Sequence, residues 1–162
     1  MITKKDLKDL YEWSKTNNFP IKCAPTAEGY SNKPIKFCWI KKNIKTIVVR
    51  KSIIQNFHIQ SIYENPDILF SMYVIFDENT RLGPHKDPNI YKEPYKRIQI
   101  PIEIPDKEKC YMIWKGEKVH WKEGNPQLFE VMDYVHEGYN LTNKPMKFLF
   151  LDVKKSAEVE VQ

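Results

Sequence analysis

The feature that most restricts the fold is a succession of short β-strand patterns in the second half of the chain. From Ile68 onward, runs of β-branched and aromatic residues are separated by Gly, Pro, Asn and Asp, which favour turns. The predicted strands are Ile68–Phe76, Arg97–Ile104, Cys110–Lys115, Leu128–Met132, His136–Asn140 and Met146–Val153. Many short strands without long helices between them predict a mainly β fold, an antiparallel sandwich or jelly roll.

The first part of the chain has a different pattern. Thr3–Asn17 predicts an amphipathic helix that Thr3 can cap, with Leu7 and Leu10 on its apolar stripe. Ile35–Ile40 and Lys45–Arg50 predict a hairpin that turns at Lys42-Asn43, and residues 52–65 could hold a short helix. The 162 residues suit a single domain, with residues 1–65 as an N-terminal α/β decoration and residues 66–155 as a jelly-roll core.

Charge and cysteine content limit the partners and the compartment. The net charge of +5 comes from lysines spread along the chain, which favours a solvated surface over a nucleic-acid interface, although the cluster around Lys41-Lys42 could meet an anionic partner. Cys23, Cys38 and Cys110 are widely spaced and odd in number, which predicts reduced, buried thiols and a cytoplasmic protein. No secretory signal pattern is present, and no apolar run approaches the roughly 20 residues that cross a bilayer, so no membrane partner is expected.

The sharpest local motif is Gly83-Pro84-His85-Lys86-Asp87-Pro88. Side chains alternate along a strand, so His85 and Asp87 point to the same side and can bind one metal ion. A second imidazole from another strand would complete the two-histidine, one-carboxylate triad of non-haem Fe(II) oxygenases, which leaves coordination positions open.

His136 is the best candidate for that second imidazole, because it begins a later predicted strand. The other two histidines, His58 and His120, are expected at the surface or in packing positions. The alternative is that the His-x-Asp motif occurs by chance and that His136 is a hydrogen-bonded structural residue.

Polar residues on three predicted strands have two interpretations each. Lys147 lies between apolar residues on a strand that is apolar on both faces, so its ammonium is either buried against an anion or extends from the strand edge to water. Arg97 and Gln99 share the face of their strand opposite its isoleucines. They bind a ligand if that face lines a pocket, and they are surface residues if it faces water. Ser71 and Tyr73 pose the same question.

The second half of the chain resembles the aspartyl/asparaginyl β-hydroxylase family, over roughly residues 68–153. The likeness rests on an ordered set of short pieces: Phe70-Ser71, Gly83-Pro84-His85-Lys86-Asp87-Pro88, Arg97-Ile98-Gln99-Ile100-Pro101-Ile102, Trp121-Lys122-Glu123-Gly124, His136-Glu137-Gly138-Tyr139-Asn140 and Phe148-Leu149-Phe150-Leu151-Asp152.

This resemblance implies a double-stranded β-helix oxygenase that depends on Fe(II) and 2-oxoglutarate. It implies that His85, Asp87 and His136 are the catalytic metal ligands, where some members have glycine in place of the carboxylate. It also implies that Arg97 helps to hold 2-oxoglutarate or the substrate, and that Ser71 lies near the cosubstrate and helps to bind it.

One position departs from the family pattern. The family usually has an arginine about ten residues after the second histidine, which pairs with the far carboxylate of 2-oxoglutarate. Here Met146 is at that position and Lys147 follows it. Either Lys147 or Arg97 holds the far carboxylate, or Met146 takes the position and the affinity for the cosubstrate, or its identity, differs.

The expected activity is hydroxylation of a C–H bond in an Asp or Asn residue of a peptide, or in a small polar amino-acid-like molecule. The alternatives are a non-catalytic jelly-roll binding module, and an oxygenase that acts on nucleic acid or on prolyl residues. The sequence leaves the oligomeric state open.

Overall fold

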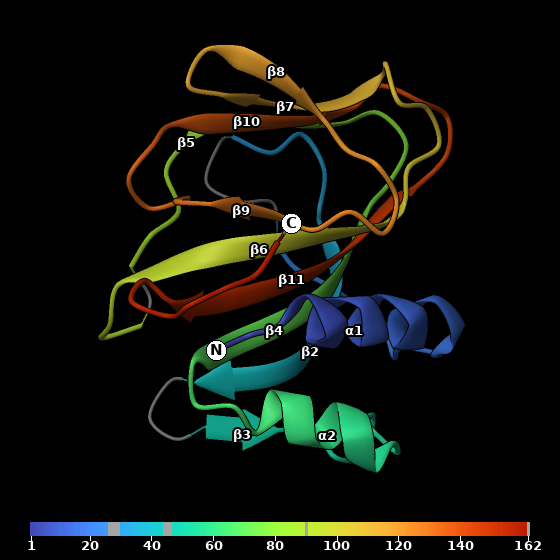
Figure 1. Cartoon of the computed structure of the whole chain (residues 1–162). Coiled ribbons are helices and arrows are strands. Elements are labelled where there is room, and N and C mark those ends of the chain that lie inside the picture. The colour runs from blue at the N-terminus through green and yellow to red at the C-terminus, as the bar shows by residue number, and fades with distance from the viewer. Residues whose placement is uncertain (26–29, 44–46, 90, 162) are drawn as a thin grey trace.

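A computed structural model describes residues 1–25, 30–43, 47–89 and 91–161 of the chain. Two β-sheets face each other, and two helices cover the outer face of the larger sheet, so the chain forms three layers (Figure 1). Helix α1 is Lys4–Thr16 and helix α2 is Phe57–Tyr63. The mainly β jelly-roll architecture with an N-terminal helix is therefore confirmed.

The larger sheet has the strand order β1-β2-β4-β11-β6-β9 among the described residues, and β3 pairs with β2 beside this path. Every one of these pairs is antiparallel. The strands are β1 (Lys22–Cys23), β2 (Lys36–Asn43), β3 (Ile47–Val49), β4 (Ile68–Phe76), β6 (Tyr95–Glu103), β9 (Gln127–Phe129) and β11 (Met146–Lys154).

The smaller sheet has the order β5-β10-β7-β8 in the part of the chain that the structure describes. Its strands are β5 (Thr80–His85), β7 (Cys110–Trp114), β8 (Glu117–His120) and β10 (His136–Asn140). A register irregularity between His136 and Gly138 lies where β10 pairs with β5. Such irregularities re-aim side chains, and this one adjoins a histidine of the predicted triad.

Two hydrophobic cores lie on opposite faces of the larger sheet, because its central strands are apolar on both faces. On β11, Leu149 and Leu151 pack in the core between the helices and the larger sheet. Phe148 and Phe150 alternate with them and pack in the core between the two sheets. This alternation decides which polar side chains of a strand can reach a site between the sheets.

Helix α1 begins as its sequence predicts. The Thr3 hydroxyl accepts a hydrogen bond from Asp6 N, and the Asp6 carboxylate accepts one from Thr3 N, so the two residues form a capping box. Leu7 and Leu10 are fully buried against the larger sheet. None of the described helices is long and apolar enough to span a membrane.

Several local predictions were wrong. Strands β5 and β8 were not predicted, because Gly83-Pro84 reads as a turn and β8 is mostly polar. The hairpin of β2 and β3 forms, but β2 continues through Lys42-Asn43, where a turn was expected, and the predicted strand start at Lys45 lies outside the described residues. Cys38 and Cys110 are buried as expected, whereas Cys23 is exposed.

Candidate metal centre

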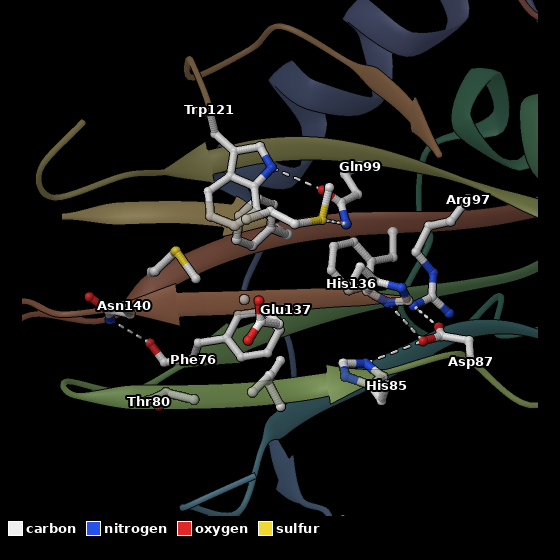
Figure 2. A pocket seen from close by; sticks show the side chains of 16 residues that line it. Phe76, Thr80, His85, Asp87, Arg97, Gln99, Trp121, His136, Glu137 and Asn140 are labelled. Atoms are coloured by element: carbon white, nitrogen blue, oxygen red, sulfur yellow. Dashed lines mark hydrogen bonds and ion pairs between the residues drawn. The ribbon is translucent and has the colours of Figure 1, made fainter. Parts of the chain in front are cut away.

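A cavity lies between the two sheets and contains the predicted triad (Figure 2). The cavity has a volume of about 60 Å³. Its lining residues are Phe76, Thr80, Leu82, His85, Asp87, Arg97, Gln99, Met112, Trp121, His136, Glu137, Gly138, Asn140, Met146, Phe148 and Phe150.

His85, Asp87 and His136 converge at one end of this cavity. Strand β5 ends at His85, Asp87 follows two residues later, and β10 begins at His136, which is the register partner of His85. Asp87 Oδ1 lies 3.5 Å from His85 Nε2 and 3.1 Å from His136 Nε2. All three ligand atoms lie within 4.8 Å of one another.

Both imidazoles are held through the nitrogen that does not face the triad. His85 Nδ1 lies 2.7 Å from the carbonyl oxygen of Gly83, and His136 Nδ1 lies 3.0 Å from that of Tyr134. A carbonyl can only accept, so each Nδ1 carries the proton and donates it. Each Nε2 faces Asp87 and can bind a metal when it carries no proton, an arrangement typical of histidine ligands. Tyr30 stacks on the His85 ring, with centroids 4.2 Å apart, and further restricts it.

Asp87 is stabilised as a carboxylate. Burial alone would raise the pKa of Asp87, but the Arg97 guanidinium, 2.6 Å away, and the imidazoles of His136 and His85 outweigh it and hold the pKa well below its usual range. Burial lowers the pKa of His85, whereas its hydrogen bonds with Asp87 and Gly83 raise it, with a net rise. A metal ion would therefore meet an ionised carboxylate and compete with protons for His85.

Asp152 holds the arginine that holds Asp87. Its carboxylate accepts hydrogen bonds from Arg97 Nε at 2.7 Å and from Arg97 Nη2 at 2.9 Å, a bidentate pair. Tyr91 Oη donates a third hydrogen bond to Asp152 at 3.0 Å. Asp152 is almost fully buried. The series of ion pairs from Asp152 through Arg97 to Asp87 thus holds the Asp87 carboxylate of the triad in position.

The structure does not bring two predicted cosubstrate residues to this cavity. Lys147 lies on the opposite face of β11 from Met146 and Phe148, where its ammonium is 2.8 Å from Glu103. The prediction that Lys147 meets a ligand is therefore wrong, because both faces of β11 are apolar and sequence alone could not tell which one faces the cavity. Met146 lines the cavity instead.

Ser71 is likewise directed away from the cavity. Its hydroxyl donates to the carbonyl of Phe150 at 2.9 Å and lies 2.8 Å from Tyr63 Oη, on the helix side of the larger sheet. Tyr73 packs on the same side, stacked on Phe19. The alternation along β4 therefore assigns Ser71 a structural hydrogen bond and not a cosubstrate contact.

The remaining histidines lie outside the site. His58 is more than half exposed, and its Nε2 is 2.6 Å from Asp9. His120 is exposed at the end of β8, and its Nδ1 lies 2.6 Å from the carbonyl oxygen of Lys107. No role was predicted for Asp152, although an acidic residue on a strand apolar on both faces indicates a buried ion pair.

The donor set fits a divalent transition metal. Ligands about 2.1 Å from a metal and at right angles are about 3 Å apart, close to the His136–Asp87 distance. Two imidazole nitrogens from neighbouring strands and a carboxylate oxygen from the segment just after β5 match the donor set of the facial-triad class of metal site, whose open positions suit Fe(II).

The family model for Aspartyl/Asparaginyl beta-hydroxylase matches residues 35–156, and the chain belongs to this family. The match includes the triad, Arg97 and Asp152. No curated protein sequence matches the chain.

Solved structures with similar folds have low sequence identity to the chain. An oxidoreductase of the 2OG-Fe(II) oxygenase family from Burkholderia pseudomallei is 8% identical, with a TM-score of 0.64 over 95% of this chain and 80% of that one. A predicted oxalate decarboxylase from Thermotoga maritima is 12% identical, with a TM-score of 0.51 over 85% and 94%. A cupin 2 conserved barrel domain protein from Rhodopseudomonas palustris is 9% identical, with a TM-score of 0.50 over 85% and 72%. At these identities the likeness shows the fold alone.

Proposed function

We propose that this chain is an Fe(II)-dependent dioxygenase that hydroxylates a C–H bond at the expense of a 2-oxo acid and oxygen. The observation that carries the proposal is the convergence of His85, Asp87 and His136 in a cavity between the sheets. Family membership and the fold shared with a 2OG-Fe(II) oxygenase support it. In the net reaction the substrate C–H becomes C–OH, and the 2-oxo acid yields carbon dioxide and the carboxylic acid one carbon shorter.

The residues of the chain have separate tasks in this reaction. His85, Asp87 and His136 would hold the iron, which when bound supplies oxygen activation and the oxidation of the C–H bond. Arg97 keeps Asp87 ionised and in place. Aromatic and apolar residues such as Phe76, Phe148 and Trp121 line the cavity and exclude water from it.

2-Oxoglutarate is the cosubstrate that the family implies, and the described residues fit it only in part. The triad leaves adjacent coordination positions for its oxo acid end. For its far carboxylate, Arg97 is the one cationic side chain among the described lining residues, and its guanidinium is already bonded to Asp87 and Asp152. The proposed substrate is an Asp or Asn side chain of a peptide or a small polar amino-acid-like molecule.

The test compares the native protein with His85→Ala and with the control His120→Ala. Co(II) binding is measured by titration, and oxygen consumption is measured with Fe(II) and a panel of 2-oxo acids, 2-oxoglutarate included. We expect metal binding and oxygen consumption in the native and His120→Ala proteins, and a loss of both in His85→Ala. The proposal fails if His85→Ala binds the metal as tightly as the native protein, as a non-catalytic jelly-roll module would allow.

A further inference from the structure

The part of the cavity beyond the triad carries no free positive charge among the described residues. Arg97 is the one lysine or arginine among the described lining residues, and it lies between two carboxylates, so Arg97, Asp87 and Asp152 together carry a net negative charge before a metal binds. Lys147 points to the opposite face of the sheet and pairs with Glu103. A ligand that extends from the metal into this cavity meets no unpaired cation among the lining residues that the structure describes.

Gln99 presents an amide donor to this space. The indole Nε1–H of Trp121 lies 2.9 Å from Gln99 Oε1 and can only donate, which fixes the orientation of the amide (Figure 2). Gln99 Nε2 therefore points the other way, where its one acceptor among the described residues is the sulfur of Met112 at 3.9 Å. A thioether is a weak acceptor, so a buried amide, only 6% exposed, keeps N–H capacity for a ligand.

The other polar side chains at this end already use their donors. Asn140 Nδ2 donates to the carbonyls of Phe76, Asp77 and Lys144, and the Thr80 hydroxyl donates to the carbonyl of Asp77. They hold the turns around β10 and leave no donor for a ligand. Gln99 is thus the neutral donor with spare capacity, and Met146 and Phe148 provide apolar surface beside it.

We propose that the 2-oxo acid used by this enzyme has an uncharged tail that accepts a hydrogen bond from Gln99 Nε2, and not a tail that ends in a carboxylate. This inference rests on the proposed function, because the metal must hold the oxo acid end for the tail to reach Gln99. A carboxylate placed among Met146, Phe148 and Gln99 loses its water and gains no cation in return. An amide or ketone oxygen meets the Gln99 donor at no such cost.

The test measures binding and not turnover. The Fe(II)-loaded protein is titrated without oxygen, by calorimetry, with three acids of similar shape: 2-oxoglutarate, 2-oxoglutaramate (its tail amide) and 5-methyl-2-oxohexanoate (its apolar isostere). We expect 2-oxoglutaramate to bind at least about tenfold more tightly than 2-oxoglutarate. A tighter or equal affinity for 2-oxoglutarate overturns the inference and leaves the proposed function intact. If none of the acids binds in a metal-dependent way, the proposed function fails as well.

Two variants and a control identify the residues responsible. Gln99→Leu should weaken 2-oxoglutaramate about tenfold and leave 5-methyl-2-oxohexanoate unchanged, whereas equal losses for both acids would contradict the role of Gln99. Met146→Arg adds a cation to the cavity and should raise the affinity for 2-oxoglutarate at least about tenfold. Lys147→Ala removes a cation from the opposite face and should change neither affinity. A loss of 2-oxoglutarate binding in Lys147→Ala would overturn the inference.

Discussion

At the scale of single residues, Asp152 is almost fully buried, and its carboxylate holds the Arg97 guanidinium in place. It is the bidentate partner of Arg97, and Arg97 in turn contacts Asp87. We predict that Asp152→Asn lowers the free energy of unfolding by about 2 kcal/mol, since it leaves Arg97 with one fewer buried charge partner. Metal affinity should fall about 10- to 100-fold, as is common when the support of a ligand is lost.

The control for this prediction is Asp133→Asn. Asp133 pairs with Lys155 on the surface, with both side chains more than 40% exposed, so its loss should change stability by less than about 0.5 kcal/mol and leave metal affinity unchanged. Denaturant unfolding and metal titration of both variants provide the comparison. Equal effects in the two variants would show that Asp152 has no special role.

Ser71 gives a second prediction at this scale, which separates a structural serine from one that binds a cosubstrate. Its hydroxyl bonds to Phe150 O, which leaves Tyr63 Oη as the donor to Ser71 Oγ, and Tyr63 is fully buried. Ser71→Ala should therefore destabilise the fold by about 1 to 2 kcal/mol, because the Tyr63 hydroxyl loses its acceptor. The affinity for 2-oxo acids should not change. A tenfold loss of that affinity at unaltered stability would restore the prediction made from the sequence.

Sequence alone was sufficient to predict site residues from their spacing along the chain. It was not sufficient where the role of a residue depends on which face of its strand lines the cavity. His85 and Asp87 are two residues apart and converge with His136, although β5 ends at His85 and Asp87 lies beyond the strand. Lys147 and Met146 are neighbours on a strand that is apolar on both sides. Only the pairing of β11 between two layers decides that Met146 faces the cavity and Lys147 faces Glu103.

At the scale of elements, Lys41 attaches helix α2 to strand β2. Its ammonium donates to the carbonyls of Tyr63 and Asn65 at the end of α2, and Lys41 has no exposed surface. Burial lowers the pKa of Lys41 from 10.5 to about 8. Between these two values the unfolded chain binds a proton that the folded chain has released, so the contribution of Lys41 to stability rises as the pH rises through this window.

We predict that the free energy of unfolding of the native protein, relative to Lys41→Met, increases by at most about 3 kcal/mol from pH 8 to pH 10.5. The measurement is denaturant unfolding of both proteins across this range. Lys42→Met is the matched control, because Lys42 is on the same strand and its partly exposed side chain lies over Trp39. Its free energy of unfolding should change with pH in the same way as that of the native protein. The prediction is contradicted if the difference in the free energy of unfolding between the native protein and Lys41→Met does not change with pH.

The strands were predictable from the sequence where their residue composition matches their burial in the fold. Strands β4 and β10 have the predicted bounds, because their composition is that of buried or half-buried strands and turn residues follow them. Strand β5 was missed, since Pro84 and Gly83 are turn residues in isolation. It forms a strand because β10 pairs with it along most of its length, a contact between segments far apart in the sequence.

At the scale of the whole molecule, the triad lies on a scaffold with two large apolar cores, so we expect the fold to form without a metal. The two cores bury large apolar side chains on both faces of the larger sheet, and the triad occupies only one end of the cavity between the sheets. Carbonyl groups orient the two imidazoles, and Arg97 orients the Asp87 carboxylate. Chelation should therefore leave the far-UV circular dichroism of the native protein unchanged.

The last prediction follows from linkage between binding and folding. An ion that binds only the folded state at about 100 times its Kd adds about 2.7 kcal/mol to stability, which for a chain of this size corresponds to a rise in Tm of roughly 5 to 10 °C. Thermal melts with saturating Mn(II) against chelator should show this rise in the native protein and in His58→Ala, whose imidazole pairs with Asp9 far from the triad in the sequence. His136→Ala should show almost no rise in Tm, because only two of the three metal ligands remain. Unfolding on chelation would mean that the ion is part of the scaffold, and an equal rise in His136→Ala would mean that it binds elsewhere.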